Sequence, residues 1–190
     1  MSQKQFLRLS AKAPYYRNRE AYMSAAAWAV ADLIARYRLR TALELGPHMR
    51  PIVSGADVMD LGAAPGLISA ARIILHDASV VPWPIADRAY DLFVGLQVFE
   101  HLGTAQRGAF AEVCRVARHA VVSLPIDWVQ KDPTDPHHQL SEERVLAWFA
   151  PRIPTRIILG NPAPGMRKIY VFEHMDRPPR TKQHGSSPGP

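Results

Sequence analysis

The segment HDASVVPWPIADRAYDLFVGLQVFEHL, residues 76–102, holds the order of features that decides the fold of this chain of 190 residues. An acidic residue, Asp77, follows a short apolar run and precedes a proline-rich loop, VPWPIAD. The next segment, YDLFVGLQ, is apolar almost without interruption, which predicts a buried strand. This strand runs directly into FEHL, so a carboxylate and a histidine follow its end. Buried strands of this kind are typical of parallel sheets that helices cover.

Segments with the pattern of buried strands occur on both sides of this stretch, and helical segments separate several of them. Six further strands are predicted at residues 40–46, 55–61, 71–77, 119–126, 154–160 and 166–175. Helices are predicted after the N-cap Asn18, over residues 104–118 and after Ser141. Strands that alternate with helices imply an α/β fold, a doubly wound and mostly parallel sheet of seven strands with helices on both faces. The last two strands are close in the chain, so we expect an antiparallel pair at one edge.

The chain is long enough for one domain with a sizeable core. Residues 1–17 lack hydrophobic periodicity and are expected to form a flexible arm or a lid, whereas residues 18–175 hold the predicted elements of a single domain. Residues 176–190 cannot bury an apolar surface, so we expect a disordered tail. A single cysteine, Cys114, excludes a disulfide within one chain.

The chain is basic, with a formal net charge of +6 and a pI near 9.8. This charge permits an acidic partner. Much of it lies in the terminal segments, however, and no basic surface interleaved with aromatic residues is apparent, so nucleic-acid binding is not favoured. No apolar stretch reaches the ~18 residues that indicate a membrane span, and MSQKQFLRLSAK lacks the apolar core of a signal peptide. We therefore expect a cytoplasmic protein with no membrane partner.

Four pieces of the sequence, in this order, resemble the class I S-adenosylmethionine-dependent methyltransferases, and specifically those of type 11. They are ALELG at 42–46, DVMDL at 57–61, the opening stretch at 76–102 and EVCRVARHAVVSLP at 112–125. The third piece is the most specific, because such enzymes often show an Asp, a loop with LPFPD, then FDLV and a closing EHL. The resemblance spans residues 30–175. It implies a Rossmann-like fold, S-adenosylmethionine as the cofactor, and methyl transfer as the activity.

The first crossover of the sheet departs from the family pattern. Nine residues separate Gly46 from Ala56, whereas a parallel crossover normally needs a dozen or more, usually as a helix. Pro47 and Pro51 oppose a helix between them, so we expect an abbreviated loop. The loss of a helix N-terminus is serious for the pyrophosphate of NAD and tolerable for S-adenosylmethionine, which has none. The departure therefore argues against a dehydrogenase.

Candidate cofactor residues lie where the predicted strands end, which is where ligands bind in open α/β sheets. Asp60 ends the second strand, and its carboxylate can accept hydrogen bonds from both ribose hydroxyls. Asp57, on the same strand, points elsewhere by alternation. The resemblance assigns the adenine contacts to Asp77 and Ala78. It assigns the turn to Gly46 and a contact with the amino group of the methionine portion to Glu44. It places Leu96 and Gln97 beside the transferring methyl group.

Histidines are candidates for the base that removes the proton of a hydroxyl acceptor. His101 matches the EHL pattern, while His137 and His138 lie in a proline-rich loop after the fifth strand; each has a purely structural role as its alternative. The candidate acceptor contacts are His48, Tyr15 and Trp128. No dedicated metal site is expected. Asp132 and Asp135 keep Mg²⁺ open as an alternative, since carboxylates suit this ion and histidines do not.

The combined reading favours O-methylation of a small-molecule or carbohydrate hydroxyl. The chain has almost no extra substrate domain, so we expect the acceptor pocket to be completed by the N-terminal arm, residues 127–140 and the second subunit of a homodimer. The basic ends leave an RNA or protein methyltransferase as an alternative, whose binding would weaken steeply with salt. The truncated first motif leaves a non-catalytic cofactor-binding scaffold as another. Base N-methylation is not expected, because no Asn/Asp-Pro-Pro-Tyr/Phe element follows the fourth strand.

Overall fold

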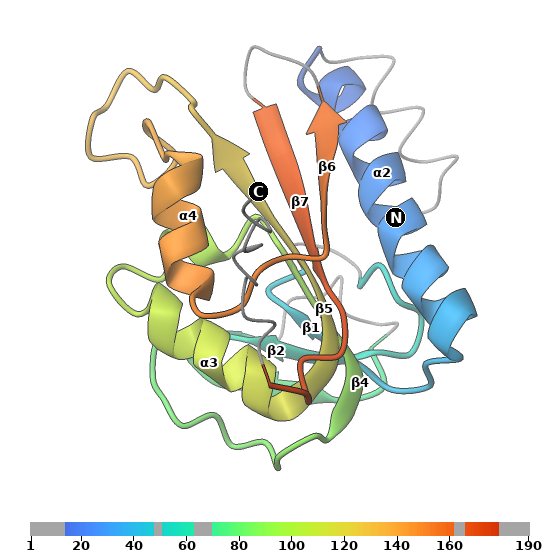
Figure 1. The fold of residues 1–190 in the computed structure, drawn as a ribbon. Helices are drawn as coiled ribbons and strands as arrows, with labels where there is room; N and C mark the ends of the chain where they lie inside the picture. The colour runs from blue at the N-terminus through green and yellow to red at the C-terminus, as the bar shows by residue number, and fades with distance from the viewer. Residues whose placement is uncertain (1–13, 48–50, 63–69, 162–165, 179–190) are drawn as a thin grey trace, which may run out of the picture.

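The computed structural model describes residues 14–47, 51–62, 70–161 and 166–178. Within these residues seven strands form one sheet in the order β3-β2-β1-β4-β5-β7-β6 (Figure 1). The strands are β1 (Ala42–Leu45), β2 (Asp57–Asp60), β3 (Ile73–Leu75), β4 (Tyr90–Leu96), β5 (Ala117–Ile126), β6 (Arg156–Asn161) and β7 (Met166–Phe172). The helices are α2 (Pro14–Tyr37), the 3-10 helix η2 (Phe99–His101), α3 (Gln106–Val116) and α4 (Glu142–Phe149).

The strand pairing confirms a mostly parallel, doubly wound sheet. Strands β1 to β5 pair in parallel, and β7 lies antiparallel between β5 and β6. The chain places β2 and β3 on one side of β1, and β4 and β5 on the other. The strand order therefore reverses between β1 and β4, and such a switch point is where open α/β sheets bind their ligands.

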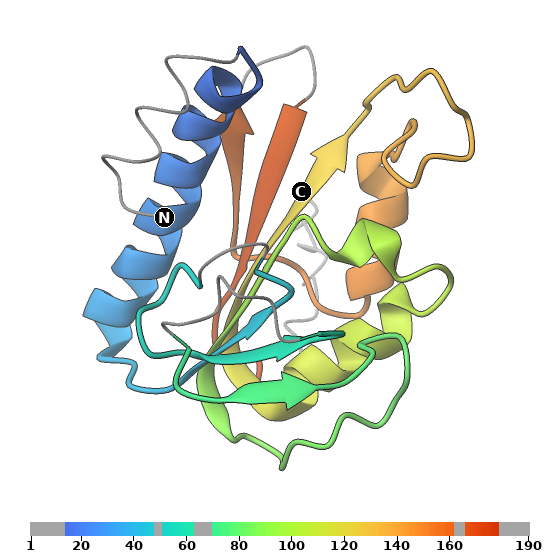
Figure 2. The ribbon, with the colours of Figure 1, turned by 180° about the vertical axis from the view of Figure 1, so that it is seen from behind.

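Helices cover both faces of the sheet, as predicted. Helix α2 lies on one face, where Ala26 and Leu33 pack with Leu92 and Val94 of β4 and Val121 of β5. The opposite face carries α3 and α4, and seen from behind the two groups of helices remain on opposite sides (Figure 2). The core on that second face contains an aromatic group made of Phe110, Phe149, Tyr170 and Phe172.

The first crossover has no helix in its described part, which confirms the abbreviated loop. Gly46 donates its N–H to the carbonyl of Met59 at 2.9 Å, so the parallel pairing of β1 with β2 extends to the first residue after β1. The Ile52 N–H then donates to the Glu44 carboxylate at 2.6 Å. Pro51 is buried in the loop. A buried carboxylate and a buried proline thus organise the backbone of a crossover that usually contains a helix.

Several boundaries differ from the prediction. Helix α2 begins at Pro14, four residues before the predicted cap Asn18, and a proline fits the first turn because its missing N–H has no partner there anyway. Residues 14–17 therefore belong to a helix and not to a flexible arm; residues 1–13 and 179–190 lie outside the described part. Strand β5 begins directly after α3, two residues earlier than predicted. Ser141 caps α4 as predicted, since its hydroxyl accepts the Arg144 N–H.

No described helix is long and apolar enough to cross a membrane.

Candidate functional site

A cavity of about 420 Å³ lies at the carboxyl ends of β1 and β2. Its walls come from the first turn, the end of β2, the loop after β3 and the segment after β4. They include Gly46, Asp60, Asp77, Ala78, Val98 and His101. Four of the predicted cofactor residues and one of the predicted bases therefore meet here, although they are spread over more than fifty positions of the chain. The volume is in the range of small-molecule and cofactor sites.

Gly46 brings the backbone to the edge of this cavity. Its φ is +58°, a conformation that side chains with a Cβ rarely adopt. A Cβ at this position would lie 3.2 Å from Cγ2 of Val98, which is closer than ordinary packing. The turn therefore needs glycine both for its backbone angle and for the space beside Val98.

Two carboxylates face the cavity from the ends of β2 and β3. Asp77 forms a tight turn, in which its Oδ1 accepts hydrogen bonds from the N–H and the hydroxyl of Ser79 at 2.9 and 2.7 Å. These bonds lower the pKa of Asp77, so it is ionised near neutral pH. The buried Trp83 holds this loop, because its indole N–H donates to the Ala78 carbonyl at 3.1 Å. Asp60 and Asp77 thus present carboxylate oxygens at the cavity, and their contact with a nucleoside stays a prediction.

Asp57 lies at the start of β2 and forms hydrogen bonds with side chains away from the cavity. Its Oδ2 accepts hydrogen bonds from Tyr90 at 2.7 Å and from Arg72 at 3.0 Å. It does not line the cavity. The choice of Asp60 over Asp57, made from strand alternation, agrees with this placement.

Three predicted cofactor residues are not part of the cavity lining. Glu44 is 3% exposed, and burial raises the pKa of its carboxyl to about 8. Leu96 packs against the α2 face of the sheet. Gln97 has a φ of +58°, and its side-chain oxygen accepts a hydrogen bond from Nε of Arg167 at 3.1 Å. None of the three lines the cavity, and their contact with a cofactor stays a prediction.

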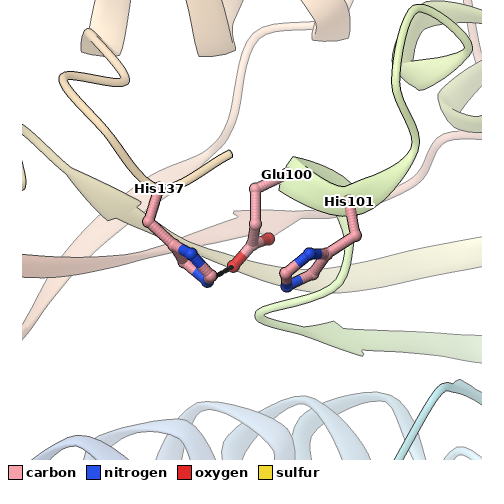
Figure 3. Close-up of side chains that lie close together, drawn as sticks. All are labelled: Glu100, His101 and His137. Atoms are coloured by element: carbon pink, nitrogen blue, oxygen red, sulfur yellow. Dashed lines mark ion pairs between the residues drawn. The ribbon is translucent and has the colours of Figure 1, made fainter. Parts of the chain in front are cut away.

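A second group of side chains adjoins the cavity. Glu100 and His101 lie on η2, directly after β4, and His137 approaches from residues 127–140. Figure 3 shows the Glu100 carboxylate between the two imidazole rings. His137 Nε2 lies 3.7 Å from Glu100 Oε1, and the two imidazole centroids are 4.8 Å apart. Because His101 also lines the cavity, this group lies at its rim.

Glu100 is the least expected member of this group. Its side chain is 0% exposed, and neither carboxylate oxygen has a hydrogen-bond partner on another described residue. Burial raises the pKa of Glu100 to about 8, and burial together with the nearby His137 lowers the pKa of His101. Sequence reasoning chose the histidine of FEHL and passed over the glutamate. The order of charged residues alone does not show which of two neighbours turns inward.

His137 is held by two neighbours from its own loop. Its Nδ1 lies 2.6 Å from Oδ1 of Asp135, which also accepts the backbone N–H of His137. The Trp128 ring stacks on the imidazole at a centroid distance of 5.8 Å and an angle of 22°. Trp128 is itself fixed, since its indole N–H donates to the Met166 carbonyl. Trp128, predicted as an acceptor contact, therefore supports a histidine, and its contact with an acceptor stays a prediction.

Among the other predicted acceptor-side residues, His138 does not join this group. Nδ1 of His138 accepts the Gln130 N–H at 3.0 Å, which ties this ring to its own loop. Of the three predicted bases, the structure thus brings together His101 and His137 and leaves His138 apart. Tyr15 belongs to α2, but its side chain lies outside the described part of the molecule, and so does the whole of His48.

Sequence reasoning also missed a polar group on the α2 side of Trp128. The Arg167 guanidinium lies 4.4 Å from the Trp128 ring centroid and 5.3 Å from that of Tyr22. The Tyr22 hydroxyl lies 2.5 Å from that of Ser123, and burial raises the pKa of Tyr22 to about 12. These residues come from α2, β5 and β7, and no local pattern connects them.

Comparison with known proteins relates this geometry to solved structures. No family model matches the sequence, and no curated protein does. The structure of the N-methyltransferase NodS from Bradyrhizobium japonicum WM9, in complex with S-adenosyl-L-homocysteine, is similar over 85% of this chain and 88% of its own, with a TM-score of 0.58 and 15% identity. The chain has the class I methyltransferase fold.

Two further solved structures share this methyltransferase fold. One is the 1,6-didemethyltoxoflavin-N1-methyltransferase from Burkholderia thailandensis, similar over 88% of this chain and 87% of its own, with a TM-score of 0.58 and 14% identity. The other is WbdD, matched over 82% of this chain and 40% of its own, with a TM-score of 0.56 and 14% identity. At such low identity the likeness concerns the fold and not the acceptor.

Proposed function

We propose that this protein is an S-adenosylmethionine-dependent methyltransferase that acts on a hydroxyl group of a small-molecule or carbohydrate acceptor. One observation carries the proposal. A cavity at the switch point of a methyltransferase fold is lined by Gly46 and by two strand-end carboxylates, Asp60 and Asp77, and it shares His101 with a group of titratable side chains. A nucleoside site and a candidate acceptor site therefore adjoin.

The cavity residues have distinct roles in binding the cofactor. The Asp60 carboxylate accepts hydrogen bonds from the ribose hydroxyls, and the ionised Asp77 accepts from the adenine amino group. Gly46 lets the cofactor approach the backbone of the first turn. The cofactor supplies an activated methyl group on its sulfonium, so the protein contributes placement and removal of water.

The group at the rim supports a hydroxyl acceptor. A neutral amine is already a nucleophile, whereas a hydroxyl gains much from a base that removes its proton. His101 has a lowered pKa, so it is neutral and able to accept a proton near pH 7. NodS and the didemethyltoxoflavin enzyme are N-methyltransferases, so an amine acceptor is the alternative that an acceptor screen must include.

The first test is calorimetric titration of the purified protein with S-adenosylmethionine and S-adenosylhomocysteine. We expect saturable binding that Asp77→Ala weakens by about tenfold or more, because a hydrogen bond to a charged group contributes roughly 1.5–3 kcal/mol. Asp132→Ala is a matched control. Asp132 forms the same turn with Thr134, at 2.8 and 2.7 Å, outside the cavity wall.

Two results would overturn the proposal. One is a folded wild-type protein that binds neither compound, and the other is an equal loss of affinity in Asp77→Ala and Asp132→Ala. If the cofactor binds, release of S-adenosylhomocysteine with sugars, phenols, amines and RNA identifies the acceptor class. A homodimer and a cytoplasmic location remain predictions, which gel filtration and cell fractionation test.

A further inference from the structure

The buried carboxylate of Glu100 lacks the partners that its position requires. A polar group that is removed from water normally forms hydrogen bonds, and an unpartnered one costs roughly 1–3 kcal/mol or more. Both oxygens of Glu100 are buried without a bond to another described residue. The Nε2 atom of His137 is 3.7 Å from the carboxylate, which is too long for a hydrogen bond. This spacing leaves room for a ligand between the two side chains.

The three side chains at this point have the chemistry and the spacing of metal ligands. Glu100, His101 and His137 each offer one ligand atom, and these atoms all lie within 4.8 Å of one another. Ligands at 2.0–2.2 Å from a tetrahedral ion are roughly 3.4 Å apart, so the 3.7 Å between His137 and Glu100 is close to such an edge. Two imidazoles and one carboxylate are a donor set of catalytic zinc sites, which keep a further position open.

The surroundings of His137 orient its ring for this purpose. Metal-binding histidines almost always donate their other ring N–H to a carboxylate or carbonyl, which selects the nitrogen that faces the ion. Asp135 lies 2.6 Å from Nδ1 of His137, on the side opposite to Glu100. The stacked Trp128 restricts rotation of the ring. The nitrogen that faces Glu100, Nε2, is thereby the free one.

We propose that Glu100, His101 and His137 bind a divalent transition-metal ion of the Zn²⁺ class, with an open position toward the cavity. The imidazoles favour such an ion over Mg²⁺, whose sites are built from oxygen ligands. The ligands also differ from the carboxylates of residues 132–135 that the sequence had offered for Mg²⁺: Asp135 acts through His137, and Asp132 takes no part. An acceptor oxygen at the open position would lose its proton more readily. With a metal bound, this effect would take the place of His101 as the base, and this role rests on the proposed function, whereas metal binding does not.

The test uses the full chain without a histidine tag, treated with a chelator and then titrated with Co²⁺, Zn²⁺ or Mg²⁺. We expect one equivalent of Co²⁺ to give the visible absorption of a four- or five-coordinate site, Zn²⁺ to displace it, and Mg²⁺ to have no effect. Asp135→Asn should weaken Zn²⁺ binding by about 10- to 100-fold, and Glu100→Gln by more, since it removes a ligand. Glu100→Gln keeps the shape of the side chain, so we expect it to fold.

His138→Ala is the matched control, because this neighbouring histidine is outside the group. Equal Co²⁺ spectra and Zn²⁺ affinities in Glu100→Gln and the wild type would overturn the inference, and so would a folded wild type that binds neither ion. S-adenosylhomocysteine is titrated into the same samples. Cofactor binding without metal binding refutes only the metal site, whereas metal binding without cofactor binding refutes only the proposed function.

Discussion

At the scale of single residues, the first turn depends on a glycine that two separate constraints require. Gly46 has a positive φ and also lies against the Val98 side chain. Gly55, at the end of the same crossover, has a φ of +76°, but a Cβ at this position would meet nothing within 4 Å among the described residues. The two glycines therefore share the backbone constraint and differ in crowding, which makes them a natural pair for comparison.

We predict that Gly46→Ala lowers both stability and cofactor affinity. A non-glycine residue at positive φ costs about 1–3 kcal/mol, and the added methyl group pushes Val98 toward the cavity. Gly55→Ala should show only the backbone cost and bind the cofactor as the wild type does. Urea unfolding and titration with S-adenosylhomocysteine measure the two effects; equal affinities in both variants would show that Gly46 does not shape the cavity.

At the scale of elements, the first crossover replaces a helix by a loop organised around Glu44. A helix satisfies its own backbone groups, whereas a short loop needs other partners. The Glu44 carboxyl accepts the Ile52 N–H from within the protein interior, where burial raises its pKa to about 8. This glutamate, predicted to contact the cofactor, thus has a structural role that the structure displays directly.

The raised pKa of Glu44 makes stability depend on pH. The folded protein keeps the proton up to about pH 8, while the unfolded chain loses it near the ordinary value of 4.5, so the free energy of unfolding falls as pH rises between these values. Glu44→Gln should reduce this slope, because the amide oxygen can still accept the Ile52 N–H and carries no charge. The raised pKa of Glu100 gives a pH dependence of the same sign, so part of the slope remains in the Glu44→Gln variant.

Urea unfolding at pH 5, 6.5 and 8 measures this slope. The exposed Glu143, at the start of α4, provides a control, since Glu143→Gln should leave the slope unchanged. A Glu44→Gln variant whose stability falls with pH as steeply as that of the wild type would contradict the buried position of the carboxyl.

At the scale of the whole molecule, the sheet is stabilised by two separate hydrophobic cores. The core under α3 and α4 contains Phe149, whose ring lies 4.6 Å from that of Phe110 and 5.0 Å from that of Phe172. This core holds α3 against the sheet, and η2 connects β4 to the start of α3. Packing far from the cavity therefore determines where Glu100 and His101 lie.

We predict that Phe149→Ala lowers the free energy of unfolding by about 3–5 kcal/mol, because a fully buried aromatic side chain leaves a cavity when it is truncated. Val129→Ala, at a side chain that is 79% exposed, should change it by no more than about 0.5 kcal/mol. Chemical denaturation of both variants tests this. A loss below about 1 kcal/mol in Phe149→Ala would contradict the packing of α4 on the sheet.

Much of the architecture was predictable because its signals are local. Apolar runs, prolines and caps act on neighbouring residues, so the succession of seven strands along the chain, the antiparallel edge and the loop between Gly46 and Ala56 all follow from short stretches. The same reasoning placed Asp60 and Asp77 at strand ends, where the sheet brings them to one cavity. The start of α2 at Pro14 was missed because the preceding segment shows no apolar periodicity.

The sequence by itself therefore determined the fold class and the location of the cavity, since both depend on hydrophobic periodicity and on which strands end in carboxylates. Only the tertiary structure decided that Glu44 and Glu100 turn inward and that His137, rather than His138, meets His101. The position of Glu44 depends on the loop that donates the Ile52 N–H, and the meeting of His137 with His101 depends on how residues 127–140 approach η2. Contacts between segments so far apart are set by packing, which no local pattern records.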